Sequence, residues 1–207
     1  VGIAVGSGIM VSQYFGAKDR DNLSRTIGTC IVLTGFSSII IMVVGPMFSR
    51  PLLELLNTPP SIIDWCTGYL NIFFLGSVGF SYYNILSGIL RGLGDSISAL
   101  VFLLISTVLN VVLDILFVAR FNMGVPGVAL ATVIAQAVSA VLCFVKLQKM
   151  KEHFDLNRST LKVNRQLSLR VVKLGLPSGV TQAIFSMAMI VVQSLTNSFG
   201  EMVIAAN

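Results

Sequence analysis

The chain has 207 residues, of which 55% are hydrophobic and only 11% are charged. Soluble domains carry about 25% charged residues, so this composition excludes an ordinary soluble protein and indicates an integral membrane protein. Its long apolar runs are separated by short polar loops. They do not fit the alternating strands, about ten residues long, of a membrane β-barrel. The sequence therefore predicts an all-α polytopic membrane protein.

The net charge of +5 would suit a nucleic-acid partner, but its distribution argues against one. Twelve of the 14 lysines and arginines lie in residues 18–25, 91–96 and 146–173, and the other two are Arg50 and Arg120. This bias predicts that the three basic segments face the cytoplasm and that the protein crosses the cell membrane several times. No nucleic-acid partner is expected.

Hydropathy predicts six membrane-spanning helices, over about residues 1–14, 26–48, 62–90, 100–118, 127–147 and 173–199. Gly45-Pro46 lies near the end of the second helix, where a kink or an end is expected, and the loop over 49–61 that follows is expected to be non-helical in places. The chain starts inside a helix without an initiating Met and stops without a terminal signal. We therefore expect it to be a piece of a longer protein.

Residues 146–170 are the one polar stretch of any length, and we interpret them as a cytoplasmic linker. An amphipathic helix over about 161–172 is expected to lie on anionic lipid headgroups. We interpret the one histidine, His153, as a solvated side chain rather than a metal ligand.

Asn110 and Asp114 stand inside the apolar run 100–118, four residues apart, so a helix places both on one face. A carboxylate at membrane depth costs roughly 2.5–3.5 kcal/mol and usually faces a polar cavity or a partner. One interpretation is an ion or proton site with Asn110 as the neighbouring ligand. The alternative is that Asp114, close to the helix end at Arg120, reaches the lipid headgroups. Position and spacing favour the ion site.

Other polar residues inside the apolar runs need partners, which favours a bundle interior or a wet cavity. Thr132 and Gln136 share one helix face, although a bond back to its own helix would be enough to explain Thr132. Tyr69, taken alone, fits an aromatic belt near the outer end of its helix. The candidates for lining a substrate cavity are Asn84, Gln136, Gln182 and Gln193.

Enzymatic and metal chemistry is not predicted, since the sequence shows no nucleophile–base pair and no metal-ligand cluster. The three cysteines, Cys30, Cys66 and Cys143, lack the spacing of a metal or redox motif. Leu90-Arg-Gly-Leu-Gly-Asp95 follows no strand, so it is not a phosphate-binding loop. We expect a cytoplasmic turn there, with Asp95 or Ser96 capping the next helix.

Six short motifs, in this order and spacing, make the chain resemble the multidrug and toxic compound extrusion (MATE) transporters of the prokaryotic type. They are Val11-Ser-Gln-Tyr-Phe-Gly-Ala17, Tyr69-Leu-Asn-Ile72, Leu90-Arg-Gly-Leu-Gly-Asp95, Asn110-x-x-x-Asp114, Gly127-Val-Ala-Leu-Ala-Thr132 and Gly175-Leu-Pro-Ser-Gly179. Each motif alone is a weak signal, but together they cover essentially the whole chain.

The resemblance implies a twelve-helix protein made of two six-helix lobes related by an internal repeat. Residues 1–148 would be the N-terminal lobe without its first helix, and 149–170 the cytoplasmic linker between the lobes. Residues 171–207 would be the first helix of the C-terminal lobe. The resemblance also implies a monomer in the lipid bilayer.

The implied function is export of cationic or amphipathic drugs in exchange for H⁺ or Na⁺, without a cofactor beyond the coupling ion. The family's coupling site matches Tyr69, Asn110, Asp114 and Thr132, joined by an aspartate on a helix that would precede this chain. With Na⁺ as the coupling ion, Asp114 and Asn110 would be metal ligands. Other branches of the family carry a glutamate on the seventh helix, which matches the last helix of this chain. No acidic residue lies between Pro177 and Phe199 here.

Two other functions are weighed against export. A lipid-linked oligosaccharide flippase shares the general fold, but such proteins tend to line their cavity with arginines or lysines. The charges inside the apolar spans are acidic here, which favours a cation exporter. A membrane scaffold without transport would leave Asn110, Asp114, Gln136 and Gln182 unexplained.

Overall fold

The computed structural model describes residues 2–56, 58–152, 154–155 and 160–198. They form α1 (Gly2–Gly16), α2 (Arg20–Leu55), α3 (Ile63–Leu75), α4 (Ser77–Gly92), α5 (Ser96–Ile115), α6 (Gly124–Lys149) and α7 (Arg165–Ser198). A π-helical turn, η1 (Leu116–Arg120), extends α5. Four helices, namely α2, α5 with η1, α6 and α7, are long and apolar enough to cross a bilayer, and α3 with α4 adds a bent fifth span. The predicted all-α polytopic fold is confirmed.

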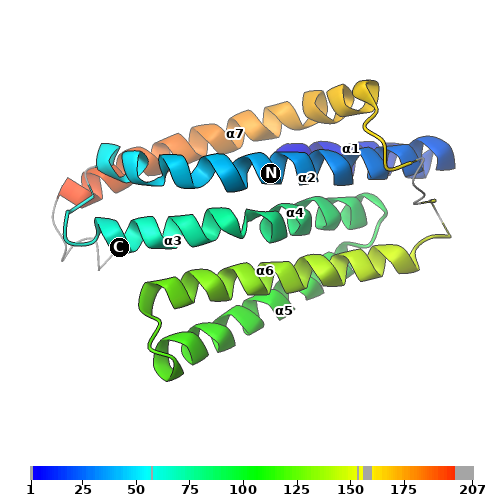
Figure 1. The fold of residues 1–207 in the computed structure, drawn as a ribbon. Helices are drawn as coiled ribbons and strands as arrows, with labels where there is room; N and C mark the ends of the chain where they lie inside the picture. Colours follow the sequence, from blue (N-terminus) through cyan, green and yellow to red (C-terminus); the bar gives the residue numbers. More distant parts are fainter. Residues whose placement is uncertain (1, 57, 153, 156–159, 199–207) are drawn as a thin grey trace.

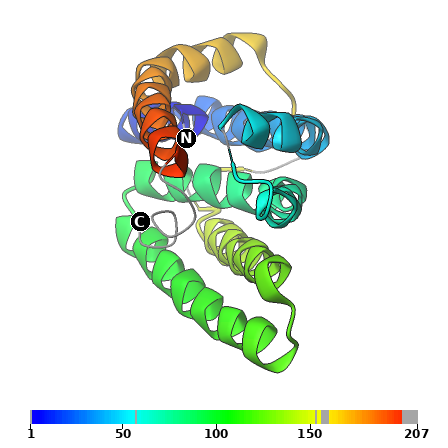
Figure 2. The same cartoon turned by 90° about the vertical axis from the view of Figure 1, so that its left-hand side faces the viewer.

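The helices form a stack of layers (Figures 1 and 2). α7 lies against α1, the pair α1 and α2 lies against α3 and α4, and α6 separates α4 from most of α5. α5 and α7 are therefore at opposite edges of the bundle, and little of either helix is buried. Their broad exposed apolar faces are those that a lipid bilayer covers.

α2 is longer than the sequence predicts. It begins at Arg20, where the Asp19 carboxylate accepts the Asn22 N–H at 3.1 Å, and it continues through Pro46 and Pro51 to Leu55. The predicted helix end at about Phe48 and the loop that was expected to start at 49 are thus wrong. Proline is tolerated inside membrane helices when a neighbouring helix supplies new partners. Here Ser49 Oγ donates to Asn71 Oδ1 of α3 at 2.6 Å, close to both prolines.

The span predicted as one helix over 62–90 is broken into α3 and α4, which meet at Gly76 with a bend of 51°. Gly/Ser pairs are frequent kink positions, and Gly76-Ser77 is such a pair. A Cβ atom on Gly76 would collide with the side chain of Val133 in α6. The bend therefore lies where the backbone packs against the Val133 side chain of α6.

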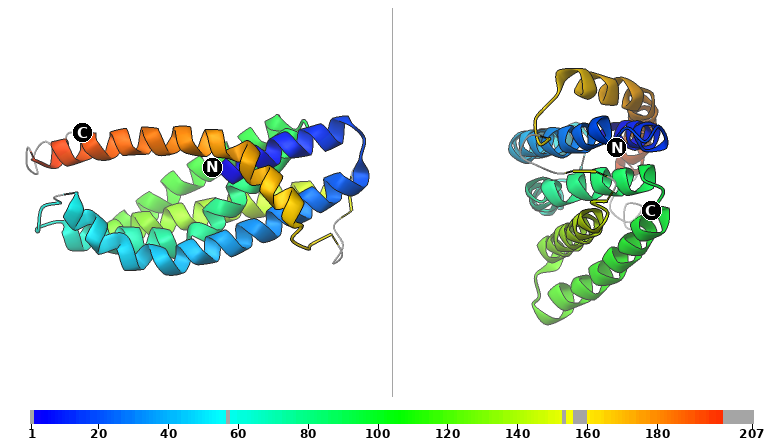
Figure 3. Two further views of the ribbon diagram at one scale, coloured as in Figure 1. Left: turned by 90° about the horizontal axis from the view of Figure 1, so that it is seen from above. Right: turned by 90° about the vertical axis from the view of Figure 1, so that its right-hand side faces the viewer.

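α7 also differs from prediction. The separate amphipathic helix over 161–172 is wrong, because α7 starts at Arg165 and runs through Pro177 to Ser198 as one element. Asn164 caps its start by accepting the Gln166 N–H at 3.0 Å. Pro177 thus lies inside the helix, not in its first turn, and Figure 3 shows that α7 bends along its length. Interior proline is a common cause of such a bend.

Glycines bring the backbones of α1 and α7 into contact. A Cβ atom on Gly2 would lie 2.9 Å from the carbonyl oxygen of Gly175, and one on Gly6 would collide with that of Val171. Gly2-x-x-x-Gly6 therefore meets Gly175-x-x-x-Gly179 at this crossing. Small residues at this spacing allow close packing of helices in lipid. The glycine spacing on α1 thus gains its role from the partner helix α7.

Candidate ion site and cavity

The first group of candidate residues lies between α5 and α6. Asn110 Nδ2 of α5 donates to Thr132 Oγ1 of α6 at 3.3 Å, and Thr132 donates to the Val128 carbonyl oxygen at 3.0 Å. The bond of Thr132 back to its own helix is thus present, as the sequence suggested. The same hydroxyl also accepts the bond from Asn110, so it links α5 to α6 in addition to bonding within its own helix.

Two oxygen atoms beside this pair are buried without a hydrogen-bond partner among the described residues. They are Asp114 Oδ1 on α5 and Gln136 Oε1 on α6. A buried acceptor left unsatisfied costs about 1–3 kcal/mol, and a charged one costs more. The shielding of Asp114 Oδ1 favours an ion or proton site over a carboxylate that reaches the headgroups.

The register of α5 and α6 places these groups along one seam. Ser139 Oγ donates to the Phe102 carbonyl oxygen at 2.9 Å. Together with the Asn110–Thr132 bond, this contact shows that α5 and α6 pack antiparallel. Asp114 is one turn from Asn110 toward η1, and Gln136 is one turn from Thr132 the other way, so the seam extends on the order of 12 Å. All four residues carry oxygen atoms, the ligands of hard cations. Asp114 with Asn110 could hold Na⁺, and Asp114 alone could take a proton.

The backbone after Asp114 is wound more loosely than an α-helix. In η1 the Phe121 N–H bonds to the Leu116 carbonyl oxygen at 3.2 Å, five residues back. Single π-helical turns are frequent at functional sites, because they are places where a helix can change its pitch.

Tyr69 stands in a different environment from the other three predicted coupling residues. Its ring stacks on Phe73 with centroids 6.3 Å apart, and Phe73 packs at 6.1 Å on Phe80. Within the described part of the chain, no hydrogen bond joins Tyr69 to Asp114, Asn110 or Thr132. The structure therefore unites Asn110 with Thr132 and places Tyr69 in an aromatic row.

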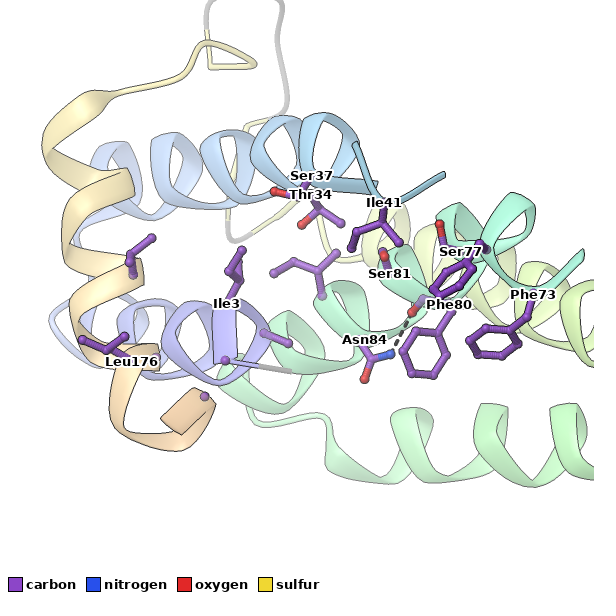
Figure 4. A pocket seen from close by; sticks show the side chains of 17 residues that line it. Ile3, Thr34, Ser37, Ile41, Phe73, Ser77, Phe80, Ser81, Asn84 and Leu176 are labelled. Atoms are coloured by element: carbon purple, nitrogen blue, oxygen red, sulfur yellow. Dashed lines mark hydrogen bonds between the residues drawn. The ribbon is translucent and has the colours of Figure 1, made fainter. Parts of the chain in front are cut away.

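That row leads to a cavity of about 500 Å³ between α1, α2, α4 and α7, with α3 at one end (Figure 4). Its wall is mostly apolar, with Phe73 and Phe80 facing it and Ile3, Ile41 and Leu176 around it. None of the described residues that line it is ionisable. Cavities of this size, apolar with a few polar groups, are typical small-molecule sites.

The polar groups of the cavity are hydroxyls and one amide, which are Thr34, Ser37, Ser77, Ser81 and Asn84. Asn84 Nδ2 donates to the Phe80 carbonyl oxygen at 2.8 Å, a bond that leaves the amide oxygen unused. Thr34 Oγ1 is buried and has no partner among the described residues. The cavity therefore offers uncharged hydrogen-bond donors and acceptors that a bound molecule can use.

The four predicted cavity residues are spread over the molecule. Asn84 lines the cavity, whereas Gln136 belongs to the α5–α6 seam. Gln182 and Gln193 lie on the exposed part of α7. Thr34 and Ser37 line the cavity but were not predicted, because small hydroxyl residues are common in any membrane helix.

The basic end of the α5–α6 pair is joined by an ion pair. Asp95 caps α5 by accepting the Ser98 N–H at 3.0 Å, as predicted, and it pairs with Lys146 Nζ of α6 at 3.1 Å. Burial by itself raises the pKa of Asp95. The bonds from Ser98 and the ammonium of Lys146 outweigh burial, so the pKa lies below its ordinary value of 3.8.

Comparison with known proteins gives consistent matches. The family model described as MatE matches residues 1–116. The chain is 30% identical to the probable multidrug resistance protein YoeA of Bacillus subtilis, over all of this chain and 46% of the relative. It is 32% identical to YpnP of the same organism, also a probable multidrug resistance protein, over 95% of this chain and 44% of the relative.

Solved structures show the same fold. An inward-facing multidrug resistance MATE family transporter of the MOP superfamily superposes with a TM-score of 0.89 at 23% identity, over 94% of this chain and 44% of that one. The chain thus spans about half the length of the relatives that it matches.

Proposed function

The chain belongs to the MatE family, and we propose that the full-length protein exports amphipathic organic cations in exchange for H⁺ or Na⁺. The observation that carries this proposal is Asp114, whose Oδ1 is buried beside the Asn110–Thr132 bond and has no hydrogen-bond partner in the described part of the chain. Ionisable groups inside membrane helices mark ion pathways and proton relays. The names of the relatives, probable multidrug resistance proteins, support drugs as the substrate class.

The cavity supports a cationic substrate. Phe73, Phe74 and Phe80 provide ring faces that attract a cation, and the hydroxyls and Asn84 can orient it. A lipid-linked oligosaccharide carries phosphate, and its carrier would need cationic side chains. The described lining of this cavity contains none. The lining therefore supports a cation exporter as the first candidate function and a flippase as the second.

The coupling would work through the charge of Asp114. Protonation, or Na⁺ bound by Asp114 and Asn110, removes the cost of an unpaired carboxylate in the α5–α6 seam. An ion can shift a conformational equilibrium only through different affinities for the two states, so the two states must solvate Asp114 differently. η1, which begins two residues beyond Asp114, is where α5 could change its pitch.

In this proposal the cavity lies between the lobes. Residues 1–148 form the N-terminal lobe in a monomer, 149–170 form the linker, and the part of α7 from 171 opens the C-terminal lobe. α1, α2 and α4 then supply one wall of the cavity and α7 the other. A change in the angle of α7 would open or close the cavity.

The test is efflux of ethidium from proteoliposomes that contain the full-length protein, driven first by a pH gradient and then by a Na⁺ gradient. We expect one gradient to drive efflux and Asp114→Asn to reduce it at least about tenfold. The matched control is Asp64→Asn, since Asp64 lies at the start of α3 and its side chain is 80% exposed.

Gradient-driven efflux that survives in Asp114→Asn, with unchanged ion dependence, would overturn the coupling role. No efflux in the wild type under either gradient would favour the flippase, and a lipid-linked sugar assay would then be decisive.

A further inference from the structure

A second depression, of about 420 Å³, lies at the basic end of the bundle, where residues 160–164 cross the first turns of α2. Three cationic side chains line it, namely Arg25 of α2, Lys162, and Arg165 at the start of α7. One carboxylate, Asp21, is also present and pairs with Arg25 at 3.1 Å. The lining side chains therefore carry a net charge of three minus one, or +2.

The backbone that carries these cations is held in place. Thr29 Oγ1 of α2 donates to the Lys162 carbonyl oxygen at 3.2 Å and accepts the Asn164 N–H at 3.4 Å. Asn164 in turn caps α7 through the Gln166 N–H. Lys162 and Arg165 thus emerge from a fixed strap of chain, next to Arg25. An anion entering here would not have to order the backbone first.

Apolar side chains are exposed around the same depression. Leu161 is 40% exposed, Val163 is 55% exposed, and Leu169 on the first turns of α7 is 60% exposed. Basic residues beside exposed apolar ones are typical of segments at the membrane interface, where the apolar groups enter the acyl region. The depression also lies at the ends of α2 and α7, two helices that cross the bilayer.

We propose that Arg25, Lys162 and Arg165 form a binding site for the phosphate of an anionic phospholipid headgroup. Arginine binds phosphate oxygens with paired N–H groups, and Arg25 keeps part of its guanidinium available beside Asp21. Basic pockets between membrane helices on the cytoplasmic side are suited to anionic headgroups. A soluble phosphate has the same chemistry, and the experiment separates the two sources. The site is independent of the exported compound.

The experiment is a titration of the purified full-length protein in neutral detergent, with bound lipid counted by native mass spectrometry. The probes are phosphatidylglycerol, phosphatidylcholine and inorganic phosphate. We expect phosphatidylglycerol to bind tightly and phosphatidylcholine weakly. The variant Arg25→Gln/Lys162→Gln/Arg165→Gln should weaken phosphatidylglycerol binding on the order of 100-fold, about fivefold for each cation. The single variant Lys162→Gln changes one exposed residue of the strap and should bind phosphatidylglycerol about fivefold more weakly. It replaces the triple variant in the test if that variant folds poorly.

The matched control removes the same charge elsewhere on the basic end, as Lys18→Asn/Lys149→Gln/Lys151→Gln. All three lysines are exposed, and asparagine suits the positive φ of 56° at Lys18. The control should change the affinity less than about twofold, since no phosphate contact is removed. If inorganic phosphate displaces the lipid at equal concentration, the site serves a soluble phosphate and the lipid source is overturned. Equal loss in the control and the triple variant, or equal binding of phosphatidylcholine, would overturn the site.

Discussion

The α5–α6 seam and the cavity are two polar regions of opposite character. The seam holds a carboxylate, Asp114, with Asn110, Thr132 and Gln136 packed along one helix pair. The cavity is wide and neutral, and α7 forms part of its wall. None of the four seam residues lines the cavity. Because the two regions share no residue, ion binding and substrate binding can be changed separately.

The largest effect is expected where the cavity wall depends on backbone contact. Gly6→Ala would press a Cβ atom against the Val171 carbonyl oxygen and push α7 away from α1. Overpacking of this kind costs about 1–3 kcal/mol, so thermal unfolding in detergent should occur at lower temperature and substrate affinity should fall.

Gly16→Ala is the control for Gly6→Ala on the same helix, since nothing lies within 4 Å of a Cβ atom there. It should be neutral or slightly stabilising, because alanine is the better helix former. Equal stability of both variants would mean that the α1–α7 contact does not support the cavity.

The next effect concerns the cavity alone. Asn84→Leu keeps the size of the side chain and removes the amide oxygen that a cationic substrate can use. Affinity for ethidium, measured by fluorescence anisotropy, should fall about tenfold, as for loss of a hydrogen bond to a charged group. The pH or Na⁺ midpoint of transport should stay unchanged. A shift in that midpoint would show that the two regions are not separate.

The converse change is made in the seam. Gln136→Leu removes a buried oxygen that has no partner among the described residues, so stability should rise by about 1 kcal/mol while ethidium affinity stays the same. Gln148→Leu, exposed near the end of α6, is the matched control and should not stabilise. A fall in stability in Gln136→Leu would show that the amide has a partner that the seam needs.

The smallest effect is expected at the ion pair that closes the α5–α6 pair. Asp95→Asn keeps the cap of α5, since asparagine is an equally good capping residue, and removes the charge that meets Lys146. We expect a loss of about 0.2–1 kcal/mol near neutral pH. The pKa of Asp95 is lowered in the folded protein. The ion pair therefore stabilises the fold above pH 3.8, the ordinary pKa of the group, and this stabilisation is lost as the pH falls through the folded-state pKa.

Unfolding temperatures of the wild type and Asp95→Asn, measured from about pH 7 downward, should therefore converge below the ordinary aspartate pKa. A difference that stays constant in acid would assign the effect to something other than the charge.

Several features of the site could be read from the sequence because they are local. Helical periodicity alone puts Asn110 and Asp114 on one face, and Thr132 and Gln136 on another. It could not show that these faces meet, since the partner of each helix depends on how the bundle packs. Tyr69 joined the set through the family resemblance, and the structure places it with Phe73 rather than with Asn110 or Thr132.

The sequence by itself determined what depends on composition and short-range pattern. It determined the membrane class, most of the spans, the bias of positive charge and the cap at Asp95. Tertiary structure decided the rest. At the α3–α4 bend Val133 of α6 leaves no room for a Cβ atom on Gly76, and between the two prolines of α2 Ser49 bonds to Asn71 of α3. The cavity exists only where four helices meet around small residues. Such features come from contacts distant in the chain, which no local pattern can encode.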